Sequence, residues 1–275
     1  MLTARCATVD ESWQDGRGFT LAASFSAHLA EMDILIEDLG LPRFVFPYEI
    51  PYASSTFPER AEQRQRTWKR LRESGLADAE ALHDEDLLTA WADPEMLLTQ
   101  LASVLDTGAR YLYRGGWRND LGFMSRQEGE TLIIERLRPE QVVAAMVGFL
   151  PDWPALRVRP VTTTTAPPSR RPDDEAEPLP VTEEPADVRG AEHFLTAPVL
   201  RYGMMACTAR EPGTGLRRAT EHALGAMTWI DTSDGRFFII TEDLPDGSQR
   251  RSYVPADNTR LAQWLRERFN AVLAS

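Results

Sequence analysis

The sequence predicts an α+β fold with antiparallel strands, and three observations carry the prediction. Apolar runs of strand length are separated by short turns, as in hairpins. Other runs repeat apolar residues at the three-, four- and seven-residue spacing of one helix face. The order helix, group of strands, amphipathic helix occurs in both halves of the 275-residue chain. This recurrence predicts an internal structural duplication.

The first half combines helices with a group of antiparallel strands. Its helix boundaries rest on serines at the starts and glycines at the ends, and its prolines mark either a first helical turn or extended chain. The expected elements are a strand over 19–23, a helix from Ser24 or Ser26 to Gly40, an extended segment over 41–57, helices over 58–74 and 84–92, a run over 96–105 that fits helix or strand, strands over 110–115, 121–126 and 131–137, and a helix that starts at Pro139.

The second half repeats this order with fewer helices. The turn Ser233-Asp234-Gly235 is a hairpin signal between two of its strands. The last helix carries Leu261, Leu265 and Phe269 on one apolar stripe. The expected elements are a short helix over 188–195, strands over 202–209, 226–232, 236–242 and 250–254, and a helix over 257–273.

The clearest change of composition lies between the two halves. Residues 160–187 are rich in proline and acidic side chains and poor in apolar ones, which is typical of a linker or long surface loop. We therefore divide the chain into an N-terminal half (1–159), a linker or loop (160–187) and a C-terminal half (188–275). The two halves are expected to form one compact unit.

The charge balance excludes several classes of partner. The chain has 42 Asp and Glu against 30 Lys and Arg, a formal net charge of −12. Because binding to phosphates or anionic lipids requires positive charge, we expect neither a nucleic-acid partner nor a membrane partner. The two cysteines, Cys6 and Cys207, are too few for a disulfide framework. With no signal peptide or apolar span, a cytoplasmic location is expected.

Residues that could carry catalysis are few. The four histidines are His28, His83, His193 and His222, and their spacing matches no common metal motif. Cys207 lies at a strand position without a partner base, which favours a small buried side chain. We therefore predict no catalytic, cofactor-binding or metal-binding residue.

The second group of strands is apolar on both faces. Alternation places Met227 and Trp229 on one face of their strand, and Thr228 and Ile230 on the other. Such a sheet needs cover on both sides: helices on one, and either more helices or a bound partner on the other. For any single residue, core packing is the interpretation we favour.

Several segments together resemble a known family. They are the run Met227–Ile239, which contains Trp229, Asp231, Thr232, Gly235 and Arg236 before an aromatic pair; Pro255–Leu261; Leu35–Pro42; Leu71–Leu76; and Val147–Pro151. In order and spacing they resemble the EspG family of type VII (ESX) secretion-associated proteins of actinobacteria. The resemblance extends from Phe19 to the C-terminus.

The resemblance implies a cytosolic chaperone without enzymatic activity or cofactor. Its partner would be a PE–PPE heterodimer or a similar helical secretion substrate, which the chaperone would bind at its apolar tip. The protein could also form a homodimer. The implied fold is α+β, with a central, mainly antiparallel sheet flanked by helical bundles and a quasi-two-fold relation between the halves. The implied client-binding residues are Trp117, in a loop expected over 115–120, and Met204, Trp229 and Phe238. The alternative is a small-molecule-binding or hydrolytic enzyme with a pocket between the halves.

Overall fold

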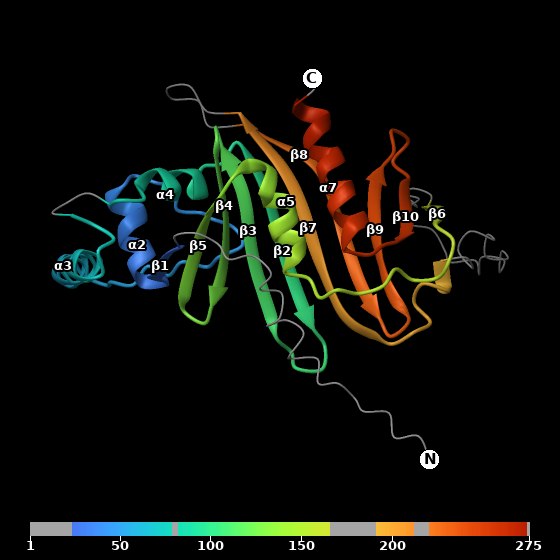
Figure 1. Ribbon diagram of the computed structural model, residues 1–275, viewed down its shortest axis with the longest axis horizontal. Coiled ribbons are helices and arrows are strands. Elements are labelled where there is room, and N and C mark those ends of the chain that lie inside the picture. The colour runs from blue at the N-terminus through green and yellow to red at the C-terminus, as the bar shows by residue number, and fades with distance from the viewer. Residues whose placement is uncertain (1–23, 79–81, 166–190, 212–219, 274–275) are drawn as a thin grey trace, which may run out of the picture.

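One continuous antiparallel sheet runs through the middle of the molecule (Figure 1). This computed structural model describes residues 24–78, 82–165, 191–211 and 220–273. The strands are β1 (Ser24–His28), β2 (Met96–Val104), β3 (Arg110–Arg118), β4 (Leu121–Glu128), β5 (Thr131–Leu137), β6 (Val161–Thr165), β7 (Val199–Glu211), β8 (Thr220–Thr232), β9 (Gly235–Asp243) and β10 (Gln249–Pro255). Their order across the sheet is β1-β5-β4-β3-β2-β7-β8-β9-β10-β6. The predicted α+β class with an antiparallel sheet is confirmed.

Helices cover the two faces of the sheet unequally. The described helices are α2 (Leu29–Asp38), α3 (Phe57–Glu73), α4 (Glu85–Ala92), α5 (Pro139–Gly148) and α7 (Asn258–Leu273). Helices α5 and α7 lie side by side over one face, in front of the sheet in Figure 1. Helices α2, α3 and α4 gather at the N-terminal end of the sheet, where α4 packs on β3 and β4. We call the side under α5 and α7 the covered face, and the opposite side of the central strands β2, β7 and β8 the open face.

Three hydrophobic clusters correspond to these layers. The largest lies between the sheet and α5 and α7, and includes Met146, Trp229 and Leu265. The second lies under α2 and α4 on the other side of the N-terminal strands, and includes Trp91 and Phe123. The third is small and centres on Leu156, Phe194 and Phe237. The opposite side of the C-terminal strands therefore has much less cover than that of the N-terminal strands.

The first described element corrects one prediction. The helix predicted to open at Ser24 or Ser26 begins only at Leu29, with His28 as its N-cap, and Ser24–His28 is the edge strand β1. Phe25 and Ala27 are both buried, and β1 pairs along β5 with Phe25 opposite Ile134. The alternation of these two apolar side chains and the unpaired edge of β5 outweigh the serine cap signal. The predicted strand over 19–23 lies outside the described residues.

The segment between the halves also differs from the prediction. Its first part, Val161–Thr165, is strand β6, which pairs with β10 at the C-terminal edge of the sheet. The rest of the predicted linker, and most of the short helix predicted over 188–195, lie outside the described residues. The ambiguous run over 96–105 is strand β2 at the centre of the sheet.

Candidate functional site

The open face exposes large apolar side chains at the centre of the sheet. Tyr202 is 44% exposed and Met204 is 40% exposed. In register beside Met204 lie the half-buried Leu101 of β2 and the exposed Thr228 of β8. Because side chains alternate along a strand, these residues share one face of three neighbouring strands. The result is an apolar strip, part of it open to solvent, along the seam where the N- and C-terminal strands meet.

The intervening residues of the same strands form the covered face. Met205 and Cys207 of β7 are fully buried, as is Trp229 of β8. Trp229 lies directly over Gly203: a Cβ added to that glycine would be 2.7 Å from the indole ring. A glycine in a strand often marks such a close approach. The backbone between Tyr202 and Met204 is thus supported from behind by a tryptophan.

The structure does not bring the four predicted site residues together. Met204 lies on the open face, whereas Trp229 and Phe238 are buried under α7, with Phe238 and Trp264 ring centroids 6.2 Å apart. Trp117 is half-buried on the covered side, edge-on to Phe269 of α7 with ring centroids 4.9 Å apart. Of the four, only Met204 is an exposed apolar side chain.

The loop predicted over 115–120 is largely strand. Gly115 and Gly116 lie inside β3, and the chain turns only at Asn119 and Asp120. A Cβ on Gly115 would be 2.8 Å from the Met146 side chain, so this glycine lets α5 approach the sheet. Gly116 faces the other side of β3, where an added Cβ would clash with the Met96 carbonyl oxygen and lie 3.1 Å from the Phe123 ring, so both glycines mark close packing inside a strand rather than a turn.

A buried charged network accounts for Asp231 and Arg236 in the Trp229–Arg236 run. Asp231 accepts hydrogen bonds from Arg236 Nε at Oδ1 (2.5 Å) and from Arg236 Nη2 at Oδ2 (3.0 Å), and Arg201 Nε lies 3.0 Å from the same Oδ2. Arg236 also donates to the Pro151 carbonyl oxygen at 3.0 Å and to Asn258 at the start of α7. All three charged side chains are buried. These residues tie β7, β8 and β9 to the layer above them, which is a structural task.

The candidate catalytic residues have ordinary surroundings. His28 caps α2 and contacts Glu130 at 2.7 Å, and His222 lies in β8. Burial raises the pKa of the Cys207 thiol to about 12, which suppresses the nucleophilic thiolate. Across the described ranges, no three His, Cys, Asp or Glu side chains lie where they could hold a metal ion together. In that same part of the chain, no helix is long and apolar enough to cross a membrane.

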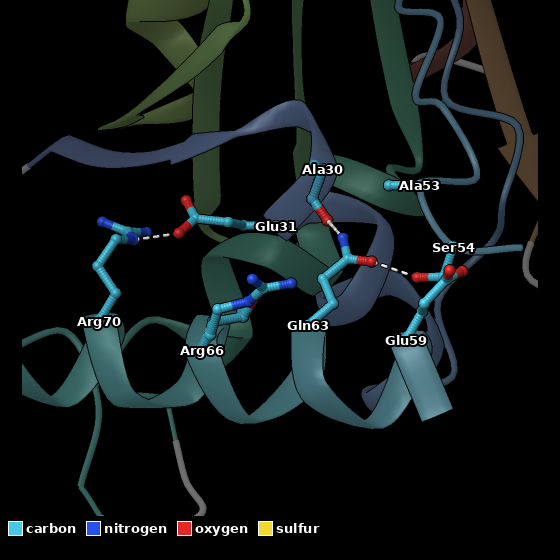
Figure 2. A pocket seen from close by; sticks show the side chains of 9 residues that line it. Ala30, Glu31, Ala53, Ser54, Glu59, Gln63, Arg66 and Arg70 are labelled. Carbon is cyan, nitrogen blue, oxygen red and sulfur yellow. Dashed lines mark hydrogen bonds and ion pairs between the residues drawn. The ribbon is translucent and has the colours of Figure 1, made fainter. Parts of the chain in front are cut away.

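One pocket, of about 540 Å³, lies between α3 and the start of α2 (Figure 2). Gln63 donates to the Ala30 carbonyl oxygen at 2.7 Å and accepts from Ser54, and Arg70 pairs with Glu31. These contacts join α3 to α2 and to the segment before α3, which is the pattern of helix packing, and Arg70 Nη2 is buried without a hydrogen-bond partner in the described part of the chain. Neither His nor Cys is among the nine side chains that line it.

Two further pockets lie elsewhere in the molecule. One, of about 660 Å³, is beside α4 and is crossed by the ion pairs of Arg136 with Asp84 and Asp86, each at 3.0 Å. The other, of about 320 Å³, lies between β8, β9 and α7. Each of the three pockets lies within one half of the chain. The alternative prediction, an enzyme pocket between the halves, finds no support among them.

Sequence reasoning missed Tyr202 as a surface residue. The signal was available, because Tyr202 and Met204 alternate with Gly203 and Met205 along one strand. What the sequence did not indicate is which of the two faces the helices cover.

Fold and surface together define a class: an α+β protein whose central antiparallel sheet has one helix-covered face and one open apolar face. The family model for the EspG family matches residues 28–267, and the chain belongs to that family. No curated protein sequence matches the chain.

Among solved structures, the fold is similar to that of the type VII secretion system chaperone EspG5 from Mycobacterium tuberculosis, solved in complex with a PE25–PPE41 dimer. The TM-score is 0.59 at 11% sequence identity. The match covers 87% of this chain and 93% of that one.

Proposed function

We propose that this protein is a type VII secretion chaperone that binds a PE–PPE-type helical client through its open face. The observation that carries the proposal is the strip of exposed apolar side chains, Tyr202 and Met204, on the central strands. Membership of the EspG family supports it, as does the similarity to a chaperone solved with a PE–PPE dimer. The chaperone would cover apolar client surface that otherwise drives aggregation.

The predicted site residues have different roles in this proposal. Met204 contacts the client directly, and its flexible thioether suits an interface that must adapt to a helix tip. Trp229 and Phe238 act from the core, because Trp229 supports the backbone of Gly203 between the two exposed side chains. Trp117 lies on the covered side, edge-on to Phe269, so in this proposal it holds α7 against the sheet and does not contact a client on the open face.

The proposal places the protein in the cytoplasm and gives it no catalytic activity and no cofactor. The net charge of −12 supports a protein client over nucleic acid or anionic lipid. The buried Cys207 thiol, whose raised pKa suppresses the nucleophilic thiolate, supports a binding protein over an enzyme.

We also propose that the two halves are a quasi-two-fold repeat. From the centre outward, one half has the order β2-β3-β4-β5-β1 and the other β7-β8-β9-β10-β6. Each edge strand precedes its four-strand meander in the sequence, and each meander is followed by a helix in the shared core, α5 or α7. In this division β6 belongs to the C-terminal half, so the boundary lies before Val161. Superposing β2–β5 on β7–β10 should bring α5 onto α7, and unrelated helix axes would refute the repeat.

The test of the function is co-expression with the PE–PPE pairs encoded near its gene, followed by size-exclusion chromatography. We expect one pair to co-elute with the wild-type protein, and Met204→Glu to abolish the complex while the melting temperature stays close to that of wild type. Phe57→Glu is the matched control, because Phe57 is 93% exposed on α3, away from the open face. Equal loss in both variants, or no co-elution with any pair, would contradict the proposal.

A further inference from the structure

Strands β8 and β9 separate halfway along their length. They pair from Thr232–Gly235 to Thr228–Ile239, and beyond that point β8 pairs only with β7 and β9 only with β10. Figure 1 shows the two strands spreading apart from their shared turn, with α7 crossing between them. Within the described residues, 220–227 of β8 and 240–243 of β9 therefore have no strand partner on the sides that face each other.

A bulge in β8 lies within the separated part of the strand. The β7–β8 register shifts between Cys207 and Thr208, so that Gly225 pairs with Cys207 and Ala223 with Thr208. A bulge bends its strand and increases its twist. Gly225 has φ +149°, and a Cβ there would lie 3.2 Å from the Trp264 ring. Its backbone conformation therefore favours glycine, and a side chain there would also crowd the Trp264 ring.

The separation leaves a cleft of about 320 Å³ rather than a filled gap. Its walls are the two strands, with Leu224 and Ala226 on one side and Ile240 on the other, and Trp264 and Arg268 of α7 lie across it. Ala226 lies on the same side of β8 as Thr228, whereas Leu224, Ile240 and Trp264 belong to the cluster under α7, so the cleft borders both faces of the sheet. Strand edges without a partner are templates for pairing with another extended chain.

The charge in the cleft comes from Arg268. Its guanidinium stacks on Trp264 at 4.9 Å from the ring centroid, and it forms no ion pair with any carboxylate in the described part of the chain. The one acid that lines the cleft, Glu242, faces Arg250 at 3.6 Å. An acidic group entering the cleft would therefore find a cation held in place by its stack on an indole.

We propose that this cleft binds an extended, acidic segment of the protein client. The segment pairs its main chain with the free edge of β8 or β9 and places a carboxylate on Arg268. A helix would not suit the site, because its interior backbone groups are already hydrogen-bonded, whereas an extended peptide can complete a strand edge. This inference rests on the proposed chaperone function and extends its binding surface beyond Tyr202 and Met204.

Hydrogen exchange of the unmodified protein, with and without a co-eluting PE–PPE pair, tests the pairing. We expect the client to slow exchange in 220–227 and 240–243. Docking on the open face alone would leave these edges unprotected, since the strands around Met204 are already paired on both sides. A complex without protection would overturn the cleft and leave the chaperone function standing, whereas absence of any complex would overturn both. Protection that needs no client and rises with protein concentration would assign the cleft to a second copy, against the proposal.

Variants of Arg268 test the carboxylate. Losing a charge-assisted hydrogen bond should weaken client binding about tenfold in Arg268→Gln, and more in Arg268→Glu. Arg268→Lys should retain most of the affinity, because it keeps the charge. Arg266→Glu, on the exposed side of the same helix, is the control for net charge. Equal effects of Arg266→Glu and Arg268→Glu, at unchanged melting temperature, would overturn the carboxylate contact.

Discussion

The two faces of strands β7 and β8 differ most in what covers them. On the covered face Met205, Cys207 and Trp229 are fully buried, while on the open face Tyr202 and Met204 are exposed. Both faces carry apolar side chains, so composition does not distinguish core from surface here. The distinction comes from layering, because α5 and α7 supply a second layer to one face only. The exposed side chains of the open face are of the same apolar kind as those in the core, but no second layer covers them.

The N-terminal strands show what a second covering layer does. There α2, α4 and the chain between them bury Phe123 and Ile134 on the side that is open at β7. On the same side of the C-terminal strands, the described residues supply only the small cluster around Phe194. A test of this comparison therefore asks whether the covered face carries stability and the open face carries binding.

The largest effect on stability is expected at the buried carboxylate of Asp231. Asp231→Ala removes the carboxylate between Arg201 and Arg236 and leaves both guanidinium groups buried without it. Breaking such a buried pair costs about 3–5 kcal/mol of the free energy of unfolding. Chemical denaturation measures this loss. The exposed Asp152→Ala should change stability by less than about 0.5 kcal/mol, and a similar small effect for Asp231→Ala would show that the network stabilises nothing.

A smaller effect is expected where Trp229 meets Gly203. In Gly203→Ala the added methyl would clash with the indole ring at 2.7 Å and with the Leu101 carbonyl oxygen. Overpacking of this kind costs about 1–3 kcal/mol, which a fall in the denaturation midpoint would report. Gly148→Ala in α5 is the matched control: no atom lies within 4 Å of its new Cβ, so it should be neutral or stabilising. Equal destabilisation of both variants would contradict this account of the close approach.

How far the sequence predicts this molecule can be judged at particular residues. The strands around Trp229 and the final helix follow from alternation and helical spacing, because those signals are local. Residues 24–28 show the limit: spacing through Phe25, Leu29 and Met32 suits a helix, but pairing with β5, more than a hundred residues away in the chain, makes them a strand. Gly115 and Gly116 suggest a turn, but both lie inside β3, where Gly115 faces the distant α5 and Gly116 faces Phe123.

The candidate site was predictable only in part for the same reason. Alternation along β7 separates Tyr202 and Met204 from Gly203 and Met205, and that division is visible in the sequence. Which set is exposed depends on where α5 and α7 pack, and the sequence leaves that open. Trp229 and Phe238 were therefore grouped with Met204 although they lie under the helices.

On the open face we expect almost no effect on stability. Met204 is 40% exposed, so Met204→Ala removes few buried contacts and should lower the free energy of unfolding by less than about 1 kcal/mol. Binding of a co-eluting PE–PPE pair should weaken about tenfold, the effect typical of an apolar contact at an interface. Measuring the denaturation midpoint and the client affinity of the same variant separates the effect on stability from the effect on binding. A large loss of stability with unchanged affinity would place Met204 in the core instead.

The smallest perturbation is a thiol probe on each face of β7. In a Cys6→Ser background, the native Cys207 should react with a thiol reagent at pH 8 only when the protein unfolds, because it is fully buried and burial raises its pKa to about 12. The pKa of the Cys207 thiol is higher in the folded protein than in the unfolded chain. The thiol therefore makes its full contribution to the free energy of unfolding at pH values below the unfolded pKa, and that contribution falls as the pH rises towards 12. A Met204→Cys variant that also lacks Cys6 and Cys207 should react at once, and a bound client should slow it. Rapid labelling of Cys207 in the native protein would mean that α7 opens readily. The covered face would then be exposed to solvent for part of the time, and the contrast between the two faces would be lost.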